Sequence, residues 1–525
     1  MDPLPSGKTT LADLPLELWF LTCSFLPNRD IKSLRLVDRA AWSRTALRLS
    51  RVFLSASPQD IDVFRKIADH ECFRRGITEI IWDDAPLPNG LEEERRDDTA
   101  TYAIREDSYP GWFFRSCEYN KRCLREHYKQ NRRQAEELIA AMLPVTESWA
   151  YFRRWREKQL RVISTGSDAA AFAYGLRRFK SLRRIQVTAV VHGRTIGFPL
   201  YETPAIRALP RGFNYPLPRG WIENEESGDH SINAGFDSAP YANPWPWRGV
   251  RICLSQLAKA VACRQEGDKT PCRITDLSLQ DDIYDVGINS RMFEEELCPT
   301  YDSLVTSLRR LDLRHFHLSL AVDDQRHRDW QAFRSRRLQS ALAAIGPMLE
   351  SLTLGTNLLA NMASIDLAHH VPLKTIFPPG VAKCWPRLDT LRLYGFWVTK
   401  TDVIALLASL PRTVRRIILG ELEFVDAEDN WRGLLYAMRD TLGWRERPAA
   451  ERPSVAIFKL TDNNGSRRLG QSTWADASTN EFLYGDGICP YGDLDDPLPN
   501  KMTAKVVTET RDAVDLANSG TTWTS

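Results

Sequence analysis

The sequence lacks several features that would assign it to a simple class of protein. No apolar run approaches the roughly 18 residues of a membrane span, and the first residues, MDPLPSGKTT, lack the charged-then-apolar pattern of a secretory signal. The ten cysteines are scattered over 525 residues, which is typical of reduced thiols. The formal net charge is only +2, so no overall attraction to nucleic acid or to an anionic membrane is expected. We therefore expect an intracellular, soluble protein of the cytoplasm or the nucleus.

Recognisable catalytic motifs are also missing from the sequence. It has no Walker loop, no GxGxxG after a strand, no GxSxG elbow and no HExxH pair. Cys117, Cys123 and His127 have a C-x5-C-x3-H spacing, but zinc sites favour closer cysteine pairs and a fourth ligand. We therefore expect a non-catalytic protein that needs no metal and no cofactor.

A strongly apolar stretch, LPLELWFLTCSFLPNRDIKSLRLVDRAAW, occupies residues 14–42. Four of its residues fall at i, i+4, i+7 and i+11, which is one face of a helix: Leu14, Leu18, Leu21 and Phe25. Pro27 and Asn28 end this helix, a second apolar stripe follows, and a third segment carries Trp42. A unit of about 40 residues rarely has enough core to be stable alone. Its surplus of apolar side chains predicts a second surface, on this chain or on another protein.

The stretch resembles the F-box pattern in Leu14-Pro15-x-Glu17-Leu18, Ser24-Phe25-Leu26-Pro27, Asp30-Ile31 and Leu34-Arg35-Leu36-Val37. The F-box is a small helical module that docks onto the Skp-type adaptor of cullin–RING ubiquitin ligases. The sequence departs from the family at Thr22 and Cys23, where larger aliphatic residues are usual, at Asp38, and at Trp42, which lies one position late.

The resemblance implies a set of residues for the Skp-type adaptor, some of which must instead hold the three helices together: Leu14, Pro15, Leu18, Leu26, Ile31, Leu34 and Val37. The alternative is a helical hairpin that only caps the rest of this chain.

The rest of the chain repeats an LxxLxL-like pattern, typical of a half-buried strand, with helical stretches between the copies. Seven copies begin at Ile77, Leu182, Ile274, Leu308, Leu349, Leu388 and Val414. Strand–helix alternation of this kind predicts an α/β fold with an irregular leucine-rich-repeat-like solenoid. The last four intervals are 34, 41, 39 and 26 residues, and only Asn357 occupies the position of the usual repeat asparagine. Several unrelated βα units in an ordinary α/β domain are the alternative.

These patterns divide the chain into five parts. They are a tail (1–10), the F-box (11–50), a helical connecting region with a first irregular repeat (51–180), the repeat domain (181–460) with a proline-rich insertion at about 198–248, and a C-terminal segment (461–525). SWAYF…EKQL, the PRGW loop and FLYGDG are similar to a large group of F-box proteins from filamentous fungi. Membership of that group implies a receptor for a protein substrate that the sequence does not identify.

The resemblance therefore predicts a substrate-recognition adaptor of a Skp–cullin–F-box ubiquitin ligase. A ubiquitin-independent scaffold that binds protein or nucleic acid is the alternative. Residues 115–161 contain 12 Lys or Arg against 6 Glu, interleaved with aromatic residues, and such a surface binds nucleic acid in some proteins. Helical periodicity instead favours aromatic residues in a core and arginines in solvent.

Overall fold

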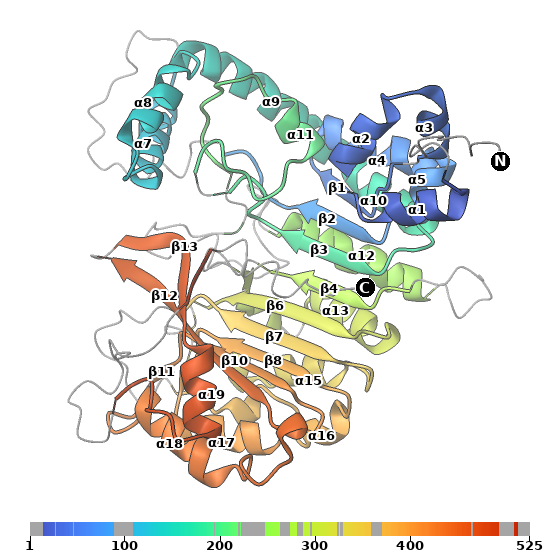
Figure 1. Cartoon of the computed structure of the whole chain (residues 1–525). Helices are drawn as coiled ribbons and strands as arrows, with labels where there is room; N and C mark the ends of the chain where they lie inside the picture. The colour runs from blue at the N-terminus through green and yellow to red at the C-terminus, as the bar shows by residue number, and fades with distance from the viewer. Residues whose placement is uncertain are drawn as a thin grey trace, which may run out of the picture.

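A computed structural model describes residues 14–26, 28–45, 47–88, 109–193, 195–218, 221, 247–262, 273–280, 287–294, 297–322, 325, 329–358, 370–463, 466–492 and 509–512. A curved sheet of 12 strands runs through the molecule (Figure 1). Its parallel part contains, in spatial order, β1 (Arg51–Ser55), β2 (Glu79–Asp83), β3 (Arg184–Thr188), β4 (Asp276–Leu279), β6 (His315–Ala321), β7 (Ser351–Thr356), β8 (Thr390–Tyr394), β10 (Arg416–Gly420) and β12 (Ser454–Asn463). The antiparallel strands β13 (Ser466–Trp474) and β14 (Glu509–Asp512) extend the sheet. Strand β5 (Ile288–Asn289) pairs with β6, and β9 (Trp397–Val398) pairs with β11 (Glu423–Phe424).

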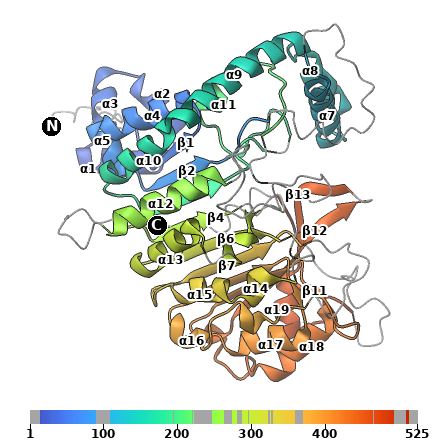
Figure 2. The same cartoon turned by 180° about the vertical axis from the view of Figure 1, so that it is seen from behind.

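Helices follow the strands and cover one face of this sheet (Figure 2). Along the sheet they are α4 (Pro58–Asp69), α5 (Glu71–Gly76), α10 (Ser167–Arg178), α12 (Arg248–Ala262), α13 (Pro299–Arg310), α14 (Gln331–Arg334), α15 (Arg337–Ala343), α16 (Val381–Cys384), α17 (Lys400–Ala408), α18 (Trp431–Thr441) and α19 (Asp476–Tyr484), with 3-10 turns η4 (Ser290–Phe293), η7 (Leu373–Thr375) and η8 (Ala449–Glu451). The helical stretches expected between the repeat copies are present, and α12, α15, α17 and α18 are among them.

The LxxLxL pattern explains why the core is continuous. The last two apolar residues of each copy point to the same face of the sheet, because side chains alternate along a strand. The first of these two residues in each copy lies directly beside its counterpart in the next strand. Together they form a ladder across the sheet: Val52, Ile80, Ile185, Leu277, Phe316, Leu352, Leu391, Ile417 and Val455. All nine are buried in one hydrophobic core. Parallel strands, alternating helices and this ladder confirm a mixed α/β, leucine-rich-repeat-like architecture.

One repeat was predicted in the wrong register. The copy expected from Leu308 lies partly on α13, where Leu308 is buried one turn after Leu304, and its strand begins only at His315. The true copy is Leu313-x-x-Phe316-x-Leu318, which overlaps the expected one. Starting it at Leu313 makes the four intervals 39, 36, 39 and 26 residues, which is more even than predicted.

The array also begins earlier than predicted. Leu49-x-x-Val52-x-Leu54 is a further copy of the pattern, and its strand β1 pairs in parallel with β2. The sheet is therefore continuous across the boundary expected at residues 180/181.

Three helices form an arm that extends from the sheet (Figure 1). They are α7 (Gly111–His127), α8 (Arg132–Ala140) and α9 (Val145–Thr165). The proline-rich segment supplies the short helix α11 (Pro204–Arg207) and then covers the aromatic core of the arm through Phe213 and Tyr215. Asn120 of α7 anchors the proline-rich segment to the arm, because its side-chain amide donates to Asn214 Oδ1 and to the Tyr215 carbonyl over 2.8 Å each. The described part of the insertion is thus an ordered cover, and residues 219–220 and 222–246 lie outside the described residues.

Candidate docking surface

The apolar stretch at residues 14–42 forms three short helices, α1 (Leu16–Ser24), α2 (Asn28–Arg35) and α3 (Arg39–Arg44). Pro15 is the N-cap of α1, where a missing N–H costs nothing. The side chain of Asp38 caps α3 by accepting a hydrogen bond from the Ala41 amide over 2.7 Å. The residue that departs from the family pattern at this position therefore begins the third helix.

One face of these helices makes a small core. Trp19, Cys23 and Ala41 are buried against one another, with Leu34 packed beside them. The Trp19 indole donates a hydrogen bond to Thr45 Oγ1 over 3.0 Å, and Ile31 is also buried. This core is small, as expected for so short a unit.

Much of the remaining surface of these helices is apolar and open to solvent. Phe25, Leu36 and Val37 keep 79%, 86% and 72% of their surface exposed. About half of the surface is exposed in five more residues: Leu16, Leu18, Phe20, Leu21 and Trp42. These eight are more than half of the 15 large exposed apolar residues in the described chain. They concentrate within one small unit, and we call them the apolar face.

The seven residues predicted for docking differ in their exposure to solvent. Pro15, Leu18 and Val37 are exposed, whereas Leu14 and Leu26 are half-buried. Ile31 is buried, and Leu34 packs on the small core. These last two hold the helices together instead of facing solvent.

Sequence reasoning left several exposed residues out of the docking set, among them Leu16, Phe20, Leu36 and Trp42. Helix α1, LELWFLTCS, is apolar on nearly every side. A helix that is apolar all round is normally buried. The apolar composition of α1 on nearly every side therefore indicates that both of its faces favour burial.

Hydrogen bonds fasten the three helices to the chain that follows. Asn28 and the Arg48 backbone bond reciprocally, with the Arg48 amide donating to Asn28 Oδ1 over 3.0 Å. The Arg48 guanidinium donates to the carbonyls of Ser24, over 2.8 Å, and Leu26. This cation lies at the C-terminal end of α1, where it complements the helix dipole.

The face of the repeat sheet opposite the helices is polar at its centre. In register across its centre it carries Gln186, Ser278, His317, Thr353 and Arg392. At its β8–β13 end lies a buried cluster, in which Phe458 stacks on Trp474 at 5.1 Å between ring centroids and the Arg392 guanidinium lies 5.2 Å from the rings of both Tyr394 and Phe458. Gln186, Ser278, Arg392, Phe458 and Trp474 are buried, so these side chains are packed inside the molecule and do not form an open docking surface.

Most aromatic residues of the basic arm are buried or half-buried, although Phe114 and Tyr119 on α7 are exposed. Trp112, Phe113, Phe152 and Trp155 are buried together, with Trp149 packed against them. Arg153 and Arg154 are exposed on the outer side of α9. The arrangement agrees with the core-and-solvent interpretation of this segment, and the base-stacking surface of a nucleic-acid site is not formed by these side chains.

The three candidate zinc ligands lie on α7 but do not converge. Cys117 is buried with its Sγ 3.6 Å from the Asn214 carbonyl, and burial raises the pKa of its thiol to about 12. His127 packs on Phe198 at 4.3 Å between ring centroids. Within the described residues, no group of three or more His, Cys, Asp or Glu side chains is arranged to hold a metal ion.

Two buried carboxyl groups fix the loops at the ends of β1 and β2. Asp84 accepts hydrogen bonds from the Gly249 amide over 2.6 Å and from Trp221 Nε1 over 3.0 Å. Burial raises its pKa from 3.8 to about 7, although these bonds oppose the shift. Asp60 accepts from Ser55 Oγ over 2.5 Å and from the Ala205 amide over 2.8 Å, and burial raises its pKa to about 6.

Comparisons with known proteins give little further information. No protein-family model matches the chain, and no curated protein matches it. Among solved structures, it is similar to the leucine-rich repeat-containing protein LegL7 from Legionella pneumophila, with a TM-score of 0.21 and 15% identity, over 45% of this chain and 78% of that chain. Among the described residues, the helices are too short or too polar to cross a membrane.

Proposed function

We propose that the protein is the substrate-recognition adaptor of a Skp–cullin–F-box ubiquitin ligase. Helices α1–α3 dock onto a Skp-type adaptor, and the repeat sheet carries an unidentified protein substrate. The observation that supports this is the apolar face, which lies open on the segment that resembles an F-box. Such a subunit acts inside the cell, in the cytoplasm or the nucleus.

The exposure of the apolar face gives a physical reason for docking. Burying a Leu, Phe or Val side chain contributes about 1.5–3 kcal/mol relative to leaving it in water. The three most exposed residues, Phe25, Leu36 and Val37, surround a unit whose own core is small. A partner that covers them completes that core, as in standard interfaces of about 1,200–2,000 Å².

The departures from the family pattern are compatible with docking. Cys23 is buried against Trp19 and Ala41, and Asp38 caps α3. Cys23 therefore acts inside the three-helix unit, and the carboxylate of Asp38, although exposed, is held by its capping bond to the Ala41 amide. Thr22 is exposed on α1, where a small side chain leaves a shallower contact.

An adaptor of this kind needs no catalytic residue. It accelerates ubiquitin transfer by holding a substrate lysine near an enzyme that is bound elsewhere in the assembly, which raises the effective concentration of the reacting groups. In this proposal the repeat array presents the surface that holds the substrate. A few buried anchors typically supply most of the affinity of such surfaces.

Co-purification with a Skp-type adaptor tests the proposal. We expect the full chain and the adaptor to elute together in size-exclusion chromatography. Leu18→Asp with Phe25→Asp should abolish co-elution, because two charges would then be desolvated on the apolar face. Leu138→Asp with Leu160→Asp is the matched control, since these leucines are also exposed but lie on the arm. Co-elution of the Leu18/Phe25 variant, or its absence for the unaltered chain, would refute the proposal.

The alternative remains a ubiquitin-independent scaffold, with the basic arm as the binding surface. It predicts salt-sensitive binding of nucleic acid or an acidic protein by residues 115–161. The full or partial burial of most of the arm's aromatic residues disfavours it, because few of them, such as Phe114 and Tyr119, then remain exposed for base stacking.

A further inference from the structure

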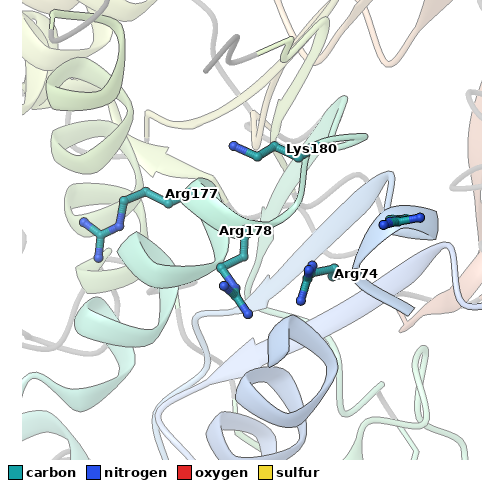
Figure 3. Close-up of a pocket in the computed structure, with 5 residues that line it drawn as sticks. Arg74, Arg177, Arg178 and Lys180 are labelled. Carbon is teal, nitrogen blue, oxygen red and sulfur yellow. The ribbon is translucent and has the colours of Figure 1, made fainter. Parts of the chain in front are cut away.

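Five cationic side chains surround a pocket of about 300 Å³ on the helix side of the repeat array: Arg74, Arg75, Arg177, Arg178 and Lys180. Arg74 and Arg75 lie in the last turn of α5, and Arg177 and Arg178 in the last turn of α10. Lys180 lies in the turn that leads to β3. Figure 3 shows Arg177, Arg178 and Lys180 around the end of one helix, with Arg74 on a second helix beside them.

The pocket has a rigid frame. Ser181 Oγ donates to the Arg75 carbonyl over 2.6 Å and joins the two helix ends. Phe64 and Phe179 are buried beneath α10 with ring centroids 5.3 Å apart. Gly175 allows this close approach, since a Cβ there would lie 2.4 Å from Phe64 Cζ. The cations are therefore brought together by the packed core and not by flexible loops.

The charge of the pocket is only partly compensated. Glu71 pairs with Arg75 over 2.5 Å, and Asp69 lies 3.4 Å from Arg178. Arg74 donates to the Asp69 backbone carbonyl over 3.2 Å. Arg177 and Lys180 are exposed and form no ion pair or hydrogen bond with other described residues. Five cations against two carboxylates leave three positive charges in a small volume.

Helix dipoles explain only part of this arrangement. A cation in the last turn of a helix is favourable by roughly 0.3–1 kcal/mol, which suits Arg74, Arg75, Arg177 and Arg178. It does not explain Lys180, nor why two helix ends and a turn place five cationic residues around one pocket. Like charges gathered around one pocket repel one another, and an anion bound between them would relieve that repulsion.

We propose that this pocket binds a compact anion that carries several phosphate groups. Guanidinium groups bind phosphate with paired hydrogen bonds, and the uncompensated charge matches a multiply charged ligand. The volume lies at the lower end of the range for small-ligand sites, about 300–1,000 Å³, so it suits a small molecule and not a folded surface. The site is independent of the apolar face and of the proposed docking.

Calorimetric titration of the full chain with sodium tripolyphosphate at about 150 mM salt tests the site. We expect saturable binding that sodium sulfate at the same concentration does not reproduce. Arg177→Gln with Lys180→Gln should weaken binding by about tenfold or more, which is about 1.4 kcal/mol. Both side chains are exposed, so folding should be unaffected.

Arg132→Gln with Lys158→Gln is the matched control, because it removes the same charge from the exposed surface of the arm. It should bind tripolyphosphate like the unaltered chain. Equal weakening in the two double variants would show attraction by general charge, and it would overturn the proposal. Absence of saturable binding by the unaltered chain, or equal binding of sulfate, would also overturn it.

Discussion

The indole of Trp19 donates a hydrogen bond to Thr45 Oγ1 over 3.0 Å, and both side chains are buried. The bond joins α1 to the residue that follows α3, so it closes the three-helix unit from end to end. The small core around Trp19 depends on it, because an indole N–H without an acceptor is costly to bury.

We predict that Thr45→Val lowers the stability of the three helices by about 1–3 kcal/mol, because valine keeps the shape but leaves the indole N–H unsatisfied. Hydrogen–deuterium exchange of the α1–α3 amides measures the effect, and the amides of β6 and β7 should keep their protection. Thr22→Val is the control, since Thr22 is an exposed threonine on α1. Equal exchange in the two variants would contradict the prediction.

Substitutions at Ile31 and Val37 should separate folding from docking, because the first residue is buried and the second is exposed. Ile31 is 1% exposed, and Ile31→Ala removes buried apolar volume. It should lower the stability of the unit by about 2–5 kcal/mol. Val37 is 72% exposed, so Val37→Asp should leave exchange in α1–α3 almost unchanged while it weakens co-elution with a Skp-type adaptor.

The exchange measurement separates these two roles. If Val37→Asp unfolded the helices as strongly as Ile31→Ala does, Val37 would belong to the core, and the apolar face would be smaller than described.

The repeat sheet was largely predictable, because each LxxLxL copy must bury two alternating residues on the helix side. The errors have local causes. Leu308 satisfies both the helical spacing from Leu304 and an LxxLxL pattern, and only packing decides between them. The copy at Leu49 was hidden, because it directly follows the three-helix unit in the sequence.

The candidate site was less predictable. In α1, the neighbours Leu18 and Trp19 are both apolar, yet Trp19 is buried and Leu18 is exposed. The choice depends on Thr45, which lies 26 residues later and supplies the acceptor for the indole. Local periodicity carries no information about such a partner. The basic pocket was also missed, because α5 and α10 are far apart in the sequence and meet only in the fold.

Asp84 should make the stability of the protein fall with rising pH. Burial raises its pKa from 3.8 to about 7, so the folded state holds the proton more tightly than the unfolded chain. The resulting stabilisation is complete below about pH 4 and is lost as the pH rises through 7. Between these limits the group contributes a slope of at most about −1.4 kcal/mol per pH unit to the free energy of unfolding. Asp60, with a pKa of about 6, acts in the same direction.

Denaturant unfolding between pH 4 and 8 measures this dependence. Asp84→Asn should make the slope less negative, and it should also lower stability, because an amide has one acceptor for the two N–H groups of Gly249 and Trp221. Asp62→Asn, at an exposed residue of α4, is the control and should keep the original slope. An unchanged slope in Asp84→Asn would mean that this carboxyl is ionised throughout the range.

Asn357 should support the junction of the β6 and β7 repeats. It is buried, and its side-chain Oδ1 accepts a hydrogen bond from the Val322 backbone N–H over 2.9 Å. Its backbone N–H donates to the Leu320 carbonyl over 3.1 Å. Phe396 and Leu422, which follow two later repeats, are buried but apolar and offer no such acceptor.

Asn357→Ala should therefore leave the buried Val322 amide unsatisfied and lower stability by about 1–3 kcal/mol. Hydrogen exchange should accelerate at Val322 while the Leu354 amide in β7 stays protected, because the strand ladder does not involve the asparagine side chain. Unchanged exchange at Val322 would show that another group replaces this acceptor, and that the repeats join through their apolar core alone.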